Sequence, residues 1–144
     1  MERTVRDIIM QQQPVTAPAE MFVQEAARVM TLRRIGAMMV VEDGVLVGIF
    51  TERDALNRVV AESMDARTTT LAEVMTRDPK TISPEATFNS ALELMHDGRF
   101  RHVPVVDAAK RPIGMISVRD AMGPELESFV YEMLRQEQVS QVLA

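Results

Sequence analysis

At 144 residues, the chain is long enough for one compact domain, or for two half-sized units of about 65 residues that share a core. Apolar residues make up 47% of the chain and charged residues 26%, which is typical of a globular protein and excludes a disordered or fibrous one. The net charge of −5 argues against a broad basic surface for nucleic acid, and the absence of cysteine excludes disulfides and thiolate metal sites.

The sequence carries no sign of a membrane or export segment. No apolar run approaches the roughly 18 residues that cross a bilayer, and the first ten residues lack the basic-then-apolar order of a signal peptide. We therefore expect a cytoplasmic protein with no membrane partner, and we do not expect it to bind nucleic acid.

A helical pattern occurs twice along the chain, 65 positions apart. In each copy, apolar residues at i, i+3, i+4 and i+7 form one face of a helix. A short β-like step that ends in proline precedes each copy, at residues 15–18 and 81–84. The repeated residues are Val23, Ala26, Ala27 and Met30 in the first copy, and Phe88, Ala91, Leu92 and Met95 in the second.

A pair of strands follows each predicted helix. Residues 37–41 and 45–50 flank Asp43 and Gly44, and Asp-Gly between apolar runs favours a tight hairpin. In the second copy, residues 103–106 and 113–116 flank a looser turn with one extra residue, so the offset between the copies becomes 66. The chain therefore contains two units of the order β-α-β-β-α.

Each unit ends in the same motif, GIFTERD at residues 48–54 and GMISVRD at residues 114–120. A strand ends there, a hydroxyl residue stands at the N-cap of a second helix, and an aspartate follows in the first helical turn. One interpretation is an ordinary capping box. The other is a ligand site, because a carboxylate accepts ribose hydroxyls while a hydroxyl, free N–H groups and nearby cations suit phosphate.

The pattern divides the chain into a first unit (1–62), a threonine-rich linker (63–70), a second unit (71–122) and a C-terminal helix (123–144). Gly123 and Pro124 should interrupt the helix that begins at Ser117. The last helix carries an apolar stripe, which either packs on its own domain or pairs with a second subunit; we favour the homodimer. The stripe consists of Leu126, Phe129, Val130, Met133 and Leu134.

Two β-α-β-β-α units that each end in Gly-x-x-[Ser/Thr]-x-x-Asp, with VPVVD at residues 103–107, resemble the tandem pair of CBS domains found in small bacterial proteins. The resemblance runs from Val5 to Met122. It implies an α+β fold in which two CBS units pack through their sheets with pseudo-twofold symmetry. It also implies two clefts for adenosine-containing ligands.

The resemblance further implies the ligand contacts. In one cleft, Thr51 and Asp54 would hold ribose or phosphate, and Ile49, Thr81 and Ile82 would hold the adenine. The mirror cleft would use Ser117 and Asp120 together with Met115, Val15 and Thr16. The candidates for phosphate are Arg53, Arg101, His102 and Arg119, and we expect more phosphate support beside Asp54 than beside Asp120. The alternative is that His102 makes hydrogen bonds at a strand entrance and that Arg53 and Arg119 are solvated.

The leading functional hypothesis is a non-enzymatic regulatory module. The chain has no cysteine, two histidines and no close-set pattern of metal ligands, so no catalytic residue or metal site is expected. No cofactor is required; the regulatory ligand is AMP, ADP or ATP, with NAD and S-adenosylmethionine as further candidates. Occupancy would be transmitted to an unknown protein partner or to the oligomeric state.

Two other functions compete with this one. The first is a structural or interaction protein with non-binding clefts, which acts through its C-terminal helix and dimer surface. The second is a relative of inosine monophosphate dehydrogenase, in which CBS pairs are inserted, but its catalytic barrel takes about 250 residues, which excludes that activity here.

Overall fold

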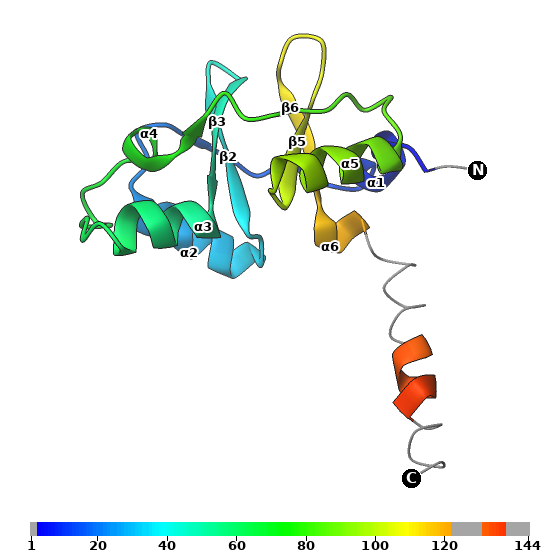
Figure 1. Ribbon diagram of the computed structural model, residues 1–144. Helices are drawn as coiled ribbons and strands as arrows, with labels where there is room; N and C mark the ends of the chain where they lie inside the picture. Colours follow the sequence, from blue (N-terminus) through cyan, green and yellow to red (C-terminus); the bar gives the residue numbers. More distant parts are fainter. Residues whose placement is uncertain (1–2, 122–130, 138–144) are drawn as a thin grey trace.

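The computed structural model describes residues 3–121 and 131–137 (Figure 1). Residues 131–137 are helical. The elements before them are, in chain order, α1 (Val5–Ile9), β1 (Thr16–Pro18), α2 (Val23–Arg33), β2 (Ala37–Glu42), β3 (Val45–Thr51), α3 (Glu52–Asp54), the π-helix η1 (Ala55–Val60), α4 (Leu71–Val74), β4 (Thr76–Arg77), α5 (Phe88–Gly98), β5 (His102–Val106), β6 (Pro112–Ser117) and α6 (Val118–Ala121).

The strands form one sheet in each unit. In the first sheet, of order β1-β2-β3-β4, β1 runs parallel to β2 and the other neighbours are antiparallel. The second sheet pairs β5 with β6, and an isolated parallel bridge between Ile82 and Val105 takes the place of β1. Mixed sheets and helices in a repeated order confirm the predicted α+β fold.

The hairpin between β2 and β3 turns at Asp43 and Gly44, as the sequence predicts. Both residues have positive φ, 51° and 79°, which is the conformation that a two-residue hairpin of this hand requires. Glycine adopts it without a steric penalty, and aspartate tolerates it better than most residues.

Each unit takes its leading helix from the other half of the chain. Val5 and Ile9 of α1 are buried in the second core with Phe88 and Met95, and the Val5 N–H donates to the Ala86 carbonyl at 2.9 Å. The blue α1 accordingly lies beside the green α5 in Figure 1. In return α4 packs in the first core through Leu71, Val74 and Met75, against Val23, Met38 and Phe50. Each core is therefore completed by residues from both halves of the sequence.

These two short helices were not predicted from the sequence. Thr4 with Asp7, and Thr70 with Glu73, form capping boxes 66 positions apart, so the repeat begins earlier than the predicted β-α-β-β-α order. The [Ser/Thr]-x-x-[Asp/Glu] spacing was the available signal. Hydrogen bonds from the backbone N–H and side chain of Thr4 lower the pKa of the Asp7 carboxyl from its ordinary value.

Part of the predicted C-terminal helix is present. Tyr131, Met133 and Leu134 lie on the helical segment 131–137 and are 67%, 47% and 56% exposed. The protein's own domain does not cover these side chains in the single chain. It would cover them if the stripe packed against that domain. The predicted break at Gly123-Pro124 and the other stripe residues, Leu126, Phe129 and Val130, lie outside the described residues.

Candidate ligand cleft

A cavity of about 1190 Å³ lies between the two units. The first unit contributes the end of α2, the start of β2 and the segment before β1. The second unit contributes the start of β5, the end of β6 and the first residues of α6. Its apolar lining includes Val15, Ile35, Met39, Met115 and Val118.

The polar lining of the cavity is mostly cationic. The arginines are Arg34, Arg101 and Arg119, all exposed, with His102 beside them and Glu52 as a carboxylate on the same wall. Arg34 is the C-cap of α2 in the left-handed conformation, which directs the chain sharply from the helix into β2. Phosphate groups are favoured by such a rim, because three guanidinium groups outnumber the single carboxylate.

His102 enters the cavity through the space that Gly36 leaves, because glycine has no side chain. A Cβ atom added at Gly36 would lie 3.1 Å from His102 Cε1 and 3.3 Å from Glu52 Oε1. Any larger residue would displace these side chains, so the glycine lets a side chain of the second unit approach the first unit's backbone. The Gly36 carbonyl also accepts the Glu52 N–H at 3.0 Å, and the Arg101 carbonyl accepts the Val118 N–H at 3.1 Å.

Gln12 ties the floor of the cavity to β6. Its side-chain amide donates to the Met115 carbonyl and accepts the Met115 N–H, each at 3.0 Å. In the first sheet, β4 pairs by its backbone with the equivalent stretch of β3, with Thr76 opposite Ile49. A side-chain amide therefore replaces a strand in the second unit and holds Met115 at the edge of the cavity.

A second, smaller cavity of about 580 Å³ lies at the repeat-related position. It is lined by the end of α5 together with Arg53 and Arg101. Phe100 stands where the first unit has Ile35, and the Arg53 guanidinium donates to the Arg99 carbonyl at 3.2 Å. One donor of the Arg53 guanidinium is therefore engaged by the backbone at the end of α5.

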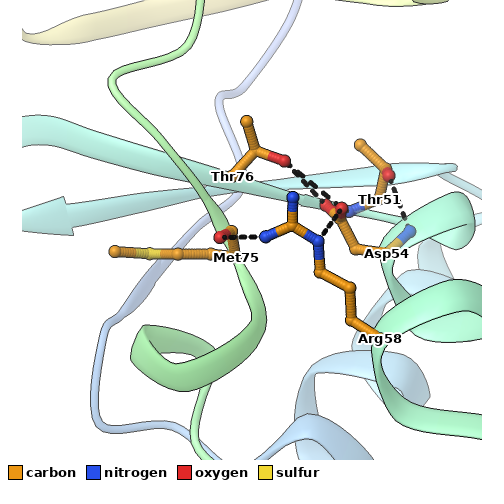
Figure 2. Close-up of polar contacts among 5 residues, drawn as sticks. All are labelled: Thr51, Asp54, Arg58, Met75 and Thr76. Carbon is orange, nitrogen blue, oxygen red and sulfur yellow. Dashed lines mark hydrogen bonds and ion pairs between the residues drawn. The ribbon is translucent and has the colours of Figure 1, made fainter. Parts of the chain in front are cut away.

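Asp54 lies in a closed polar cluster (Figure 2). It is 7% exposed, and its Oδ2 accepts the Thr51 N–H at 3.0 Å while Thr51 Oγ1 accepts the Asp54 N–H at 3.1 Å. The Thr76 hydroxyl donates to Asp54 Oδ1 at 3.2 Å, and Arg58 Nε lies 3.6 Å from the same oxygen. Arg58 also donates to the Met75 carbonyl at 3.0 Å. The capping-box interpretation of this motif is confirmed for Thr51 and Asp54.

The structure brings together one of the two residue sets predicted from the sequence. Ser117, Met115, Val15 and Arg119 line the large cavity. Thr16 is exposed outside it, and the Asp120 side chain lies outside the described part of the structure. Thr51, Asp54, Ile49, Thr81 and Ile82 line neither of the two cavities.

One placement differs from the expectation. His102 was expected to support phosphate beside Asp54, but it lies in the large cavity with Ser117, and Arg101 lines both cavities. The reason is the open space at Gly36, which admits His102 from the opposite unit. The richer cationic lining is therefore on the Ser117 side.

Several lining residues of the large cavity were not predicted from the sequence, among them Arg34, Glu52 and Gln12. Arg34 had no signal beyond its place after a predicted helix, and Glu52 had none beyond its place next to Thr51 in the motif. Gln12 was missed because its partner, Met115, is 103 positions away.

Comparison with known proteins settles the family. A family model for the CBS domain matches residues 5–61 and 71–123. The chain belongs to the CBS domain family. The mitochondrial CBS domain-containing protein CBSX3 of Arabidopsis thaliana is 37% identical over 105 residues, which cover 69% of this chain and 50% of the relative. The chain thus spans half the length of that relative.

Solved CBS structures share the fold. A CBS-domain protein from Burkholderia ambifaria, described as a putative signal-transduction protein, is 31% identical, with a TM-score of 0.77 over 83% of this chain and 90% of that chain. The CBS domain pair of protein MJ0100, in complex with 5′-methylthioadenosine and S-adenosyl-L-methionine, is 28% identical. Its TM-score is 0.75 over 83% of this chain and 93% of that chain.

Two features of the described residues bear on other functions. Within residues 3–121 and 131–137, no three His, Asp or Glu side chains gather as a metal site would require. No helix in this part of the chain is long and apolar enough to cross a membrane.

Proposed function

We propose that this CBS pair is a non-enzymatic regulatory module that binds an adenosine-containing ligand in the large cavity between its units. One observation carries the proposal: apolar and cationic side chains from both units line the same cavity of about 1190 Å³. Such a cavity is large enough for a nucleotide, and a few placed polar groups in a largely apolar site are typical of ligand pockets. The adenosyl ligands of the MJ0100 pair support the ligand class.

The cavity suggests a division of roles. Val15 and Met115 offer apolar contact for the adenine, and Ser117 offers a polar group for the ribose; the motif adds Asp120 as a ribose candidate. Arg34, Arg101 and Arg119 surround the space for phosphates. A nucleoside phosphate such as AMP, ADP or ATP fits this lining better than a cationic ligand such as S-adenosylmethionine, because the rim has a net positive charge.

Regulation follows from the position of the cavity. A ligand that contacts both units binds one relative arrangement better than another, and so shifts the balance between them. Affinity for a protein partner that prefers one arrangement changes by the same coupling. We expect the partner to be a cytoplasmic protein or a second copy of the chain.

A homodimer would suit the exposed apolar side chains outside the cavity. Leu32 on α2 is 83% exposed, and Leu56 and Val60 on η1 are 61% and 68% exposed. Burial of such side chains stabilises association. Light scattering should give twice the monomer mass, and Leu56→Glu should shift the mass toward 16.1 kDa, the mass of one chain. A wild-type mass of one chain would contradict the homodimer.

Thermal unfolding tests the ligand proposal. The melting temperature is measured with AMP, ADP, ATP, NAD and S-adenosylmethionine, for the wild type and for Asp120→Ala. A bound ligand at about 100 times its Kd stabilises the folded protein by roughly 2.7 kcal/mol, which raises the melting temperature by several degrees. Asp120→Ala should abolish the shift. No shift with any of the five compounds would overturn the proposal.

The second candidate is an interaction protein without ligand. It is favoured by the internal use of Asp54 and by the exposure of Tyr131, Met133 and Leu134. If no ligand shifts the melting temperature and deletion of residues 123–144 abolishes self-association, this candidate replaces the first.

A further inference from the structure

The carboxylate of Asp54 has little capacity left for a ligand. A carboxylate offers about four acceptor positions. The Thr51 N–H, the Thr76 hydroxyl and Arg58 Nε already surround its two oxygens, at 3.0, 3.2 and 3.6 Å. Two acceptor positions are thus filled by hydrogen bonds, the Arg58 guanidinium covers the carboxylate as an ion pair, and the residue is only 7% exposed, so the two hydroxyls of a ribose could reach it only if a present partner moved aside (Figure 2).

The partner that leaves would not be Thr51. Its N–H is one half of the capping box that begins α3, so its loss would also uncap the helix. Thr76 and Arg58 are the remaining partners. Both are linked to the segment around Met75, because Arg58 donates to the Met75 carbonyl and Thr76 follows Met75 in the chain.

That segment is held firmly against β3. Met75 is 4% exposed in the first core, and a Cβ atom at Gly48 would lie 2.5 Å from its sulfur. Thr76 therefore cannot move far from Asp54 unless the packing of Met75 on Gly48 changes. The contacts of Figure 2 form a closed unit in which the helix start, η1 and β4 hold one another.

The second unit lacks the same partners in its sequence. At the offset of 66 that relates Asp54 to Asp120, Arg58 corresponds to Pro124 and Thr76 to Met10. Neither proline nor methionine has a side-chain donor for a carboxylate. In the sequence, the two residues that hold Asp54 thus have no equivalent donors for Asp120.

From this difference we infer that Thr76 and Arg58 occupy Asp54 in place of ribose hydroxyls, and that they limit the chain to one adenosyl ligand. This inference rests on the proposed function, in which that single ligand binds in the large cavity with Ser117. It makes Thr76 and Arg58 the residues that determine which cleft binds.

Isothermal titration calorimetry with AMP measures the number of sites per chain. The wild type should bind one AMP. Thr76→Val, which keeps the shape of the side chain and removes the hydroxyl, should bind a second AMP, and so should Arg58→Met. The matched control Thr76→Ser keeps the hydroxyl and should still bind one. Adding Asp54→Asn to Thr76→Val should remove the second site.

The outcomes separate this inference from the proposed function. Two AMP bound by the wild type, or one AMP bound by folded Thr76→Val and Arg58→Met, would overturn the inference and leave the cavity proposal intact. If the wild type binds none and Thr76→Val binds one in an Asp54-dependent manner, the cavity proposal fails and the inference stands. Circular dichroism shows whether each variant is folded, and Arg58→Met, altered at a half-exposed side chain, serves if Thr76→Val does not fold.

Discussion

The two halves of this molecule carry the same motif in different surroundings. In the first half, the hydroxyl and carboxylate of Thr51 and Asp54 begin a helix and bind Thr76 and Arg58 of their own chain. In the second half, Ser117 faces a cavity of about 1190 Å³ with arginines around it. A duplicated motif therefore does not imply two equal sites, because residues far from the motif in sequence determine whether its polar groups are available.

The largest expected effect comes from a matched pair of glycine substitutions, which compares how tightly the two units pack behind their motifs. A Cβ atom at Gly114 would lie 2.7 Å from Cβ and Cγ2 of the β-branched Ile9. At Gly48 it would lie 2.5 Å from the sulfur of Met75, an unbranched side chain that can change rotamer, and 3.0 Å from the Thr76 carbonyl oxygen. Gly114→Ala should lower the free energy of unfolding by about 3 kcal/mol, and Gly48→Ala by about 1 kcal/mol, the two ends of the usual range for overpacking. Urea unfolding measures both. Equal losses of unfolding free energy would show that the Met75 and Ile9 side chains accommodate the added methyl group equally well, and would contradict the predicted difference.

Removal of Asp54 should affect stability and not ligand binding. Asp54→Ala loses the capping interaction and the Thr76 hydrogen bond in a buried position, which should lower the free energy of unfolding by about 2 kcal/mol. The Kd for AMP at the large cavity should stay unchanged. Unfolding in urea and calorimetry give the two quantities, and a stable variant that no longer binds AMP would reverse the interpretation of the two halves.

The cationic rim should discriminate between ligands. Arg34→Ala should weaken ATP binding about tenfold, equivalent to about 1.4 kcal/mol, and leave binding of the uncharged 5′-methylthioadenosine unchanged. Arg33→Ala is the matched control, because Arg33 is the exposed neighbour that does not line the cavity. Equal weakening by both variants would mean that overall charge, and not the rim, attracts the phosphates.

The smallest expected effect concerns the leading helix of the second unit. Thr4→Ala should lower the free energy of unfolding by about 1 kcal/mol through loss of the N-cap. The pKa of Asp7 should rise toward its ordinary value of 3.8, which an NMR titration measures. Because the folded-state pKa lies below the unfolded one, the contribution of Asp7 is complete above the unfolded value and is lost as pH falls through the folded value. A pKa that does not move in Thr4→Ala would contradict the capping account.

Much of the fold was predictable because its signals are local. The helical faces that begin at Val23 and Phe88, and the Asp43-Gly44 turn, depend on residues a few positions apart. The exchange of α1 and α4 between the cores was not predictable in this way. Their capping boxes were visible in the sequence, but which core a short apolar helix joins depends on the path of the whole chain.

The candidate site was predictable in its motif and not in its environment. Ser117, Met115 and Val15 line one cavity, and their contact with a ligand stays a prediction. The partners of Asp54 come from four and 22 positions away, and His102 lies in the large cavity because Gly36 leaves space in the opposite unit. Such contacts arise only after the units pack, so a motif read on its own overstates what its carboxylate is free to bind.

A crystal structure of the protein with AMP tests the central claim most directly. The account predicts one AMP per chain in the large cavity, with its adenine near Val15 and Met115, its phosphate within reach of Arg34, Arg101 or Arg119, and the Asp54 cluster unchanged. An AMP whose ribose is held by Asp54, with Thr76 and Arg58 moved aside, would contradict it.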